Sequence, residues 1–366
     1  MDKSSKIYVA GHHGLVGSAI WNNLKARGYV NLVGRSSKEL DLRDAAATER
    51  FFAEEKPEYV ILAAAFVGGI VANLRYRGDF IYNNLAIQNS VIGAAYRHGV
   101  KKLLFLGSTC IYPGVCPQPM KEEYLLTSGL EYTNEPYAIA KIAGLKMCES
   151  FNLQYGTNFI AVMPTNLYGP NDNFDLERSH VLPALIRKIV LGHALEQGDW
   201  TLIRADLAKR PVEGIDGAAS EEAIVEILSK YGVRRRVDGR VEVEIWGSGK
   251  PLREFLWSEE MADACVYIME QVDFKDLIPA DAGQSGEIRN CHINIGTGKE
   301  ISIAGVAELI RKRAGFEGEL YFNASKPDGT LRKLTDVSKL HGLGWHHRID
   351  IEEGVGRMIE WYRQSI

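Results

Sequence analysis

The sequence places a tyrosine and a lysine four residues apart, at Tyr137 and Lys141. In a helix, residues at this spacing lie on one face. An ammonium group beside a phenol favours the phenolate, so it lowers a pKa that is ordinarily near ~10. Such a tyrosine can give a proton to a carbonyl oxygen, or take one back, near neutral pH. The same spacing also occurs on solvated helix surfaces, so this interpretation depends on the features around it.

Small polar side chains follow an apolar run that predicts a buried strand. The run Leu103–Gly107 is followed directly by Ser108, Thr109 and Cys110. In a doubly wound parallel sheet, ligands bind beyond the carboxyl ends of the strands. We therefore expect Ser108 to hold a substrate carbonyl oxygen beside Tyr137. A serine at this point is also common as a turn residue.

The first apolar run, Ile7–Ala10, leads into a loop with three glycines, and a stretch with helical periodicity follows. Glycines let the backbone approach a pyrophosphate, and a helix N-terminus offers unpaired N–H groups and a positive dipole end. The spacing is G-x-x-G-x-x-G, whereas typical dehydrogenases have G-x-G-x-x-G. The loop predicts dinucleotide binding by Gly11, His12, His13, Gly14, Leu15, Val16 and Gly17.

The end of the second expected strand bears on which nicotinamide binds. NAD-binding folds usually carry Asp or Glu there for the ribose diol, whereas a cation such as Arg35 suits a 2′-phosphate. A solvated strand-end charge is the other interpretation of Arg35. We favour NADP(H) as the cofactor.

Apolar runs alternate with helical stretches through the first half of the chain, with strands expected at 7–10, 31–33, 59–64, 102–107 and 158–163. This alternation implies βαβ units in an α/β protein, with a Rossmann-type doubly wound parallel sheet. We expect an NADP-binding domain at 1–175 with a return crossing near 253–300. A smaller α/β substrate lobe is expected from 176–252 and 301–366. It includes a charge-rich inserted stretch at about 196–243, which is either a surface elaboration or a cap or subunit contact.

The composition is that of a soluble globular protein. The chain has 366 residues, a net charge of −4 and 25% charged residues, so nothing indicates nucleic-acid binding. The longest apolar stretch, about 60–72, is too short to span a bilayer, and no secretory signal is visible. The five cysteines lack metal-ligand spacing and are odd in number. We expect a cytoplasmic protein with no membrane association and no metal site.

Four longer motifs carry a family resemblance: A-A-F-V-G-G-I from Ala64, N-E-P-Y-A-I-A-K from Asn134, M-P-T-N-L-Y-G-P from Met163 and K-P-D-G-T from Lys326. With the glycine loop, they resemble the extended short-chain dehydrogenase/reductases, and among these the GDP-L-fucose synthase family. The resemblance covers nearly the whole chain. It implies NADPH-dependent epimerisation at C3 and C5 and reduction at C4 of GDP-4-keto-6-deoxy-D-mannose, which gives GDP-L-fucose.

The resemblance also implies roles for residues. Tyr137 and Ser108 would stabilise the ketone oxygen, Lys141 would hold the nicotinamide ribose, and Cys110 and His180 would form the acid–base pair. Further cofactor contacts would come from Asp41, Leu42, Leu106, Gly107, Thr109, Pro164, Thr165, Asn166, Leu167 and His180. The GDP-sugar would contact Lys188, Trp246, Arg253 and Lys326. Related enzymes often carry an Arg in the glycine loop, where this chain has His12 and His13. Relatives often form homodimers through helices at about 80–98 and 137–155.

Three other functions are open to the sequence. The motifs recognise a C4 ketone and do not specify the sugar, so the enzyme could be a C4-reductase of another GDP-4-keto-deoxysugar or a GDP-heptose, with or without epimerisation. A 4,6-dehydratase typically carries an acidic residue soon after the strand-end serine, and Thr109-Cys110-Ile111 has none. A non-catalytic NADP(H) sensor commonly loses the Tyr or the Lys, and both are present here.

Overall fold

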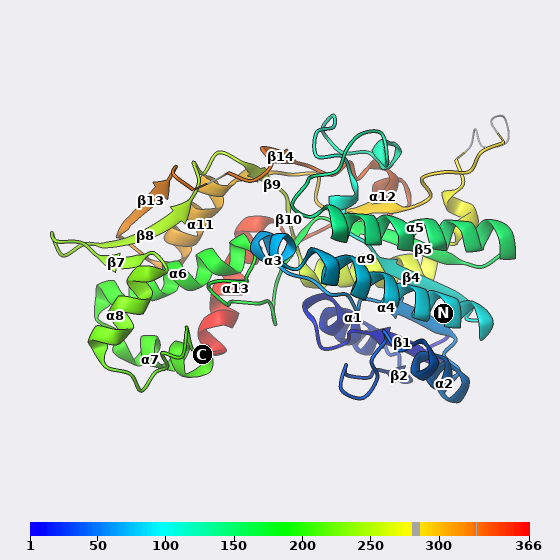
Figure 1. Ribbon diagram of the computed structural model, residues 1–366, viewed down its shortest axis with the longest axis horizontal. Coiled ribbons are helices and arrows are strands. Elements are labelled where there is room, and N and C mark those ends of the chain that lie inside the picture. The colour runs from blue at the N-terminus through cyan, green and yellow to red at the C-terminus, as the bar shows by residue number, and fades with distance from the viewer. Residues whose placement is uncertain (280–285, 327) are drawn as a thin grey trace. The chain divides into compact units, whose positions relative to one another are not determined.

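The computed structural model describes residues 1–279, 286–326 and 328–366 (Figure 1). The chain divides into two compact units. Unit 1 consists of Met1–Leu167, Glu254–Lys299 and Leu334–Arg348, and unit 2 consists of Tyr168–Arg253, Glu300–Lys333 and Ile349–Ile366. Both units are therefore built from segments that are distant in the sequence. Pro327, within the K-P-D-G-T motif, and 280–285, within the expected return crossing, lie outside the described residues.

Unit 1 contains a six-stranded parallel sheet with the order β11-β5-β4-β3-β1-β2. Its strands are β1 (Ile7–Ala10), β2 (Leu32–Val33), β3 (Tyr59–Leu62), β4 (Lys102–Leu106), β5 (Phe159–Pro164) and β11 (Ile293–Ile295). The helices around it are α1 (Leu15–Ala26), α2 (Ala45–Glu55), α3 (Ile70–Arg75), α4 (Arg77–Arg97), α5 (Glu135–Tyr155), α9 (Ser258–Gln271) and α12 (Ser338–Gly342). The expected doubly wound sheet is confirmed.

Both faces of this sheet are buried, which explains why its strands are continuous apolar runs. Along β1, Ile7 and Val9 belong to a core shared with α1 and α9. Tyr8 and Ala10 belong to the opposite core, shared with α2, α4 and α5. The first core also includes Leu340 and Trp345, from the last segment of unit 1. Figure 1 shows α4 and α5 running side by side over the sheet.

A buried lysine ties α9 to the sheet. Lys102, at the start of β4, is 3% exposed, and its Nζ donates to the carbonyl oxygens of Ile268, Met269 and Val272 at the C-terminal end of α9. Asp273 lies 3.5 Å away. Burial lowers the pKa of this lysine, and Asp273 opposes that effect. A cation at a helix C-terminus meets its unpaired carbonyls and its negative dipole end.

Unit 2 contains a sheet of three strands in the order β13-β8-β7, and a second small sheet of β12, β9 and β14. Its strands are β7 (Val233–Arg235), β8 (Val241–Trp246), β9 (Leu252–Arg253), β12 (Ile301–Ser302), β13 (Glu319–Asn323) and β14 (Arg332–Lys333). Its helices are α6 (Val181–Gln197), α7 (Trp200–Lys209), α8 (Glu221–Lys230), α11 (Ile303–Ala314) and α13 (Ile351–Gln364). Two further short strands, β6 (Asn166–Tyr168) and β10 (Phe255–Trp257), pair with each other.

The inserted stretch folds as α7, α8 and β7. Its strand β7 pairs antiparallel with β8 and so extends the sheet of unit 2 by one edge strand. Its helix α7 carries Asp206, which is 0% exposed and accepts hydrogen bonds from Arg187 on α6 at 3.0 and 2.8 Å. Tyr362 on α13 donates its hydroxyl to the same carboxylate at 2.5 Å. Buried side chains thus fasten α7 to two other helices of the unit.

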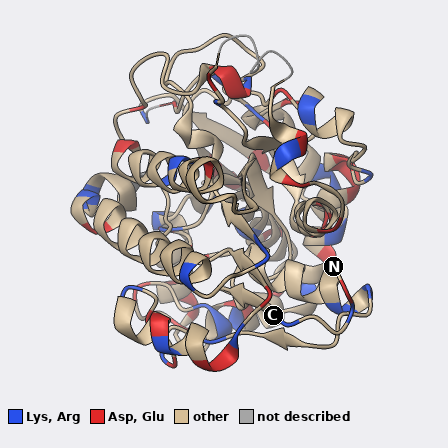
Figure 2. Ribbon diagram, turned by 90° about the vertical axis from the view of Figure 1, so that its right-hand side faces the viewer, with Lys and Arg blue, Asp and Glu red and all other residues tan. Residues whose placement is uncertain are grey.

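The charges of the molecule are mixed. Figure 2 shows Lys and Arg interspersed with Asp and Glu along the helices of the face that it presents. None of the helices in the described ranges is long and apolar enough to cross a membrane.

Candidate active site

The glycine loop connects β1 directly to α1. Gly11 has φ +83°, and a Cβ there would lie 2.8 Å from the backbone nitrogen of Ala64. A Cβ on Gly17 would lie 2.0 Å from the carbonyl oxygen of Gly11. Gly14 is the N-cap of α1 and supplies no side-chain hydrogen bond to the helix. The N-terminus of α1 therefore keeps main-chain N–H groups for an anion, and this loop fits a dinucleotide pyrophosphate.

Both histidines of the loop pack against one another, with ring centroids 3.8 Å apart. The ring of His12 also lies against Gly34 and is 5.3 Å from Trp21 on α1. Loss of hydration, and then the neighbouring His13, lower the pKa of His12. His12 thus fills the space over the end of β2, while His13 is exposed.

Arg35 does not point freely into solvent. Its guanidinium donates to Glu55 on α2 at 2.6 Å and to the carbonyl oxygen of Gly34 at 2.9 Å. Asp41 is paired with Arg43 at 2.7 Å, and Leu42 is buried in the core of unit 1. Hydrogen bonds from Arg43 lower the pKa of Asp41. A 2′-phosphate at Arg35 would compete with the carboxylate of Glu55.

The carboxyl end of β4 carries the expected polar residues. Ser108 accepts a hydrogen bond from the main-chain nitrogen of Cys110 at 3.3 Å, which starts a short 3-10 helix, Thr109–Ile111. Gly107 has no room for a side chain, because a Cβ would lie 2.3 Å from the sulfur of Met163. Thr109 and Cys110 are buried, and Ser108 is half-buried.

Tyr137 and Lys141 lie in the first two turns of α5, beside the end of β4. The Nζ of Lys141 donates to the carbonyl oxygen of Leu106 at 2.7 Å and is 5.6 Å from the centre of the Tyr137 ring. Cys110 lies close enough that its ionised form would raise the pKa of both. Unit 1 therefore brings Tyr137, Lys141 and Cys110 together at one end of β4.

The pKa of Tyr137 differs from the expected direction. The spacing predicted that Lys141 would lower it, but burial, and then Cys110, raise it well above its ordinary value. Burial also lowers the pKa of Lys141 to about 8, with Cys110 opposing that effect. The reason is geometric, because the ammonium is bonded to Leu106 and not to the phenol. The lowered pKa of Tyr137 predicted from the spacing is thus wrong.

The segment Pro164–Leu167 leaves the end of β5. Thr165 is buried and donates its main-chain N–H to the carbonyl oxygen of Ile295 at 3.0 Å. The side chain of Asn166 donates to the carbonyl oxygen of Glu254 at 2.9 Å. This segment therefore lies at the carboxyl end of the sheet, as the glycine loop and the end of β4 do.

Five predicted residues lie in unit 2. His180 is the exposed N-cap of α6, and partial loss of hydration lowers the pKa of its imidazole. Lys188 lies two turns further along α6 and donates to the carbonyl oxygen of Glu244 on β8 at 3.3 Å. Burial lowers the pKa of Lys188 to about 8, with Glu244 opposing that effect.

Trp246 ends β8 and is 59% exposed. Lys326 places its ammonium 5.2 Å from the centre of that indole ring. Arg253 on β9 donates to the carbonyl oxygens of Leu252 at 2.7 Å and Thr330 at 2.6 Å. Unit 2 therefore pairs Trp246 with Lys326 and directs Arg253 toward the loop that follows Lys326.

Two residues without an assigned role shape these loops. Asp328 belongs to the K-P-D-G-T motif. Its carboxylate accepts hydrogen bonds from the main-chain nitrogen of Ser248 at 2.8 Å and from the hydroxyl of Ser248 at 2.7 Å. Glu254 directly follows Arg253 and is fully buried. The sequence gives only a weak signal for Glu254, because it lies between Arg253 and the apolar run Phe255–Trp257, and a carboxylate is rarely fully buried.

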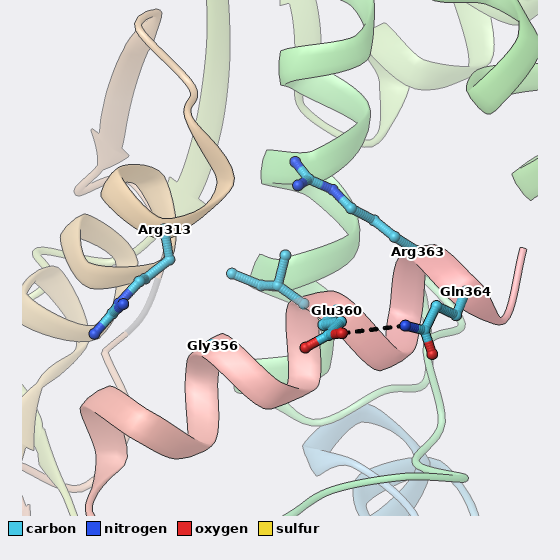
Figure 3. Close-up of a pocket in the computed structure, with 6 residues that line it drawn as sticks. Arg313, Gly356, Glu360, Arg363 and Gln364 are labelled. Atoms are coloured by element: carbon cyan, nitrogen blue, oxygen red, sulfur yellow. Dashed lines mark hydrogen bonds between the residues drawn. The ribbon is translucent and has the colours of Figure 1, made fainter.

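A surface hollow of about 550 Å³ lies in unit 2, between α11 and α13. Figure 3 shows its lining side chains, including Arg313, Glu360 and Arg363. None of the predicted site residues lines it. The described residues also contain no group of three or more His, Cys, Asp or Glu that could hold a metal ion.

The fold and the loop–strand–helix geometry are those of a nucleotide-dependent oxidoreductase or epimerase. The model of the NAD dependent epimerase/dehydratase family matches residues 7–212 and 216–296, so the chain belongs to that family. GDP-L-fucose synthase 1 of Arabidopsis thaliana is 47% identical over 365 residues, covering 100% of this chain and 95% of that protein.

Two solved structures from Campylobacter jejuni are similar over the whole chain. A GDP-6-OMe-4-keto-L-xylo-heptose reductase is 46% identical, with a TM-score of 0.91, and the match covers 100% of this chain and 99% of that one. A GDP-mannoheptose C4 reductase with NADP bound is also 46% identical, with a TM-score of 0.85 and 99% of each chain covered.

Proposed function

We propose that the protein is an NADPH-dependent enzyme that epimerises C3 and C5 and reduces C4 of GDP-4-keto-6-deoxy-D-mannose, giving GDP-L-fucose. The observation that carries this proposal is the grouping of Tyr137, Lys141, Ser108 and Cys110 at the carboxyl end of β4. A reductase needs the first three, and an epimerase needs an additional acid–base group such as the thiol. The similarity to GDP-L-fucose synthase 1 of Arabidopsis supports the same substrate.

The reduction step assigns one task to each residue. Ser108 and Tyr137 hydrogen-bond the C4 oxygen, which gains negative charge, and Tyr137 delivers the proton to it. Lys141 holds the nicotinamide ribose, and the glycine loop with the N-terminus of α1 holds the pyrophosphate. Bound NADPH supplies the hydride to C4. Arg35 interacts with the 2′-phosphate, while Asp41 and Leu42 position the adenine.

Epimerisation needs a proton removed from one face of the sugar ring and another delivered to the opposite face. Cys110 and His180 serve as this acid–base pair, since a thiol and an imidazole both titrate near neutral pH. The C4 oxygen becomes an enolate during each exchange, and the same Tyr137 and Ser108 stabilise it.

The two units then divide the ligands between them. Unit 1 binds the nicotinamide dinucleotide, with Leu106–Thr109 and Pro164–Leu167 completing its site. Unit 2 binds the GDP-sugar: Trp246 stacks on the guanine, and Arg253, Lys188 and Lys326 contact the diphosphate and the sugar. Arg253 is suited to bidentate contact with a phosphate, whereas the lysines act as point charges.

A second substrate class has a specific observation in its favour. Structures at 46% identity are reductases of GDP-heptoses, and 46% is nearly the identity to the plant fucose synthase. The alternative function is therefore C4 reduction of a GDP-heptose or another GDP-4-keto-deoxysugar, with or without epimerisation.

One assay tests both functions. The purified protein is incubated with NADPH and GDP-4-keto-6-deoxy-D-mannose, and NMR identifies the product. GDP-L-fucose supports the first proposal, and a C4-reduced sugar with unchanged C3 and C5 supports the reductase alone. If the protein consumes no NADPH with this substrate but reduces a GDP-4-keto-heptose, GDP-heptose reduction replaces GDP-L-fucose synthesis as the proposed function.

The epimerase half has its own test. With NADP⁺ bound, so that no hydride is available, wild-type protein should exchange the C3 and C5 hydrogens of the ketosugar with deuterated solvent. Cys110→Ser should abolish this exchange, because a hydroxyl has a pKa far above that of a thiol. His180→Gln should allow partial exchange. Exchange at the wild-type rate in Cys110→Ser would remove the thiol from the mechanism.

We also infer a homodimer formed through α4 and α5, in a cytoplasmic protein. Tyr96 on α4 stacks on Tyr155 of α5 at 4.3 Å, with Phe151 beside both rings, and the two tyrosines stay exposed. An exposed aromatic group of this kind fits a subunit interface. The five cysteines form no disulfide, which fits a reducing compartment.

A further inference from the structure

The side chain of Glu254 lies at the points where the chain passes between its two units. Glu254 is 0% exposed and is the first residue of the second segment of unit 1. The chain crosses from one unit to the other at five places, after Leu167, Arg253, Lys299, Lys333 and Arg348, and each place is called a crossing here. Three of these crossings lie within two residues of a hydrogen-bond partner of Glu254, and a fourth is the peptide bond between Arg253 and Glu254 itself.

Each oxygen of the carboxylate accepts hydrogen bonds from residues beside a different crossing. Oε1 accepts from the main-chain nitrogens of Thr297 at 2.6 Å and Gly298 at 2.7 Å, just before the crossing at Lys299. Oε2 accepts from the main-chain nitrogen of Thr335 at 2.9 Å and from its hydroxyl, just after the crossing at Lys333. The hydroxyl of Thr297 also donates to Oε1 at 3.4 Å, so main-chain N–H groups and two hydroxyls compensate the charge of the buried carboxylate.

The main chain of Glu254 is bonded to residues at the other two crossings. Its carbonyl oxygen accepts from the side chain of Asn166 at 2.9 Å and from the hydroxyl of Thr165 at 3.4 Å, and both precede the crossing at Leu167. Its amide nitrogen is joined by the peptide bond to Arg253. The packing is close, because a Cβ on Gly296 would lie 2.3 Å from Oε1.

These bonds link two groups with different proposed ligands. Thr165 and Asn166 belong to the segment assigned to the nicotinamide cofactor, and Arg253 is assigned to the GDP diphosphate. A shift of the Thr165–Asn166 segment would pull on the carbonyl group of Glu254, and the preceding peptide bond would carry the shift to Arg253. A continuous hydrogen-bonded network of this kind can transmit coupling between two ligand sites.

We propose that Glu254 is a positioning residue that couples binding of the nicotinamide nucleotide to binding of GDP. The inference rests on the proposed function, because it needs both ligands to bind this chain. It adds a role for a residue that contacts neither. Both carboxylate oxygens are needed as acceptors. A glutamine has one carbonyl oxygen and one NH₂ group, and the NH₂ group cannot accept a hydrogen bond from the N–H donors that it would face, so the bonds on that side would be lost.

The experiment measures GDP binding by calorimetry with and without saturating NADP⁺. Wild-type protein should bind GDP about fivefold or more tightly when NADP⁺ is present, the lower end of typical couplings. Glu254→Gln should reduce this ratio toward one. Thr335→Val removes only the hydroxyl donor and should reduce the ratio partly, which keeps the test valid if the first variant fails to fold.

Glu149→Gln is the matched control. Glu149 is also a buried carboxylate of unit 1, with a main-chain hydrogen bond from Cys291, but its partners lie away from the crossings. It should keep the wild-type ratio. A folded Glu254→Gln protein with the wild-type ratio, or a wild-type ratio of one, overturns the proposal. Wild-type protein that binds neither GDP nor NADP⁺ would instead refute the proposed function itself.

Discussion

At the scale of single residues, the state of Tyr137 determines how the reduction is tested. Its phenol is half-buried, and burial raises its pKa, which favours the protonated phenol that donates a proton over the phenolate. Tyr137→Phe should lower turnover by about 10²-fold or more, the scale of general acid catalysis. NADPH affinity, measured by fluorescence titration, should change little. Wild-type-like reduction by this variant would show that another group donates the proton.

Lys141 should give a pH-dependent contribution to stability. Burial lowers its pKa to about 8, below the ordinary value of ~10.4. Between these values the unfolded chain binds more protons than the folded protein, so the free energy of unfolding rises with pH. Lys141→Met lacks this titration. It should therefore be more stable than wild type at pH 7, with an advantage that shrinks toward pH 10. Urea unfolding of both cofactor-free proteins at three pH values tests this, and a constant difference would contradict it.

Arg35 should discriminate between the two nicotinamides. Arg35→Ala should weaken NADPH binding by about 1.5–3 kcal/mol, the range for a hydrogen bond to a charged group, and leave NADH binding nearly unchanged. Glu55→Gln releases Arg35 from its ion pair and should not weaken NADPH binding. Equal losses for NADPH and NADH in Arg35→Ala would make the arginine a structural residue of the contact between β2 and α2.

Some candidate site residues could be predicted from the sequence and others could not. Tyr137, Lys141 and Ser108 follow local patterns, because a helix or a strand end places them by spacing, whereas the role of Cys110 was implied by the family resemblance. Glu254 follows no local pattern, since its partners come from segments near 166, 298 and 335. The hydrogen bond from Lys141 to the carbonyl oxygen of Leu106 could not be predicted from the sequence either, because it depends on how α5 packs against β4.

At the scale of elements, the inserted helix α7 should depend on its buried ion pair. Arg187 is 1% exposed, and Asp206→Asn would leave its charge uncompensated. The free energy of unfolding should fall by about 3–5 kcal/mol. The double variant Arg187→Met with Asp206→Leu should recover much of that loss, because apolar pairs replace buried ion pairs at little cost. Chemical denaturation tests this, and a loss below about 1 kcal/mol in the single variant would contradict it.

The central strands of the large sheet were predicted well, and the two-residue strands were not. The predicted strands 7–10, 102–107 and 158–163 match β1, β4 and β5 within a residue, because both faces of the sheet are buried and the strands are therefore continuous apolar runs. The strands β9, β12 and β14 have two residues each, too few to show any alternation. The predicted strand 31–33 is shortened to Leu32–Val33, and α3 was not anticipated.

At the scale of the whole molecule, the proposed dimer should depend on the aromatic group of α4 and α5. Tyr155→Asp places a charge beside Tyr96 and Phe151 and should give a monomer in sedimentation velocity, at a concentration where wild-type protein is a dimer. Val30→Asp, at a site in unit 1 that is 81% exposed and outside these helices, should remain dimeric. A monomeric wild-type protein would remove this interface.

The discontinuous core of unit 1 also constrains how the protein is made. A ribosome delivers the strands β1 to β5 within the first half of the chain, but β11 and Trp345 emerge only after most of unit 2. Until α9 emerges, after the first and longest segment of unit 2, the face of the sheet formed by Ile7, Val9 and Val162 has only α1 to cover it. The ammonium of Lys102 likewise waits for the end of α9. The nascent nucleotide unit therefore presents an apolar surface for most of its synthesis, and chaperones that bind such surfaces have a long window in which to engage it.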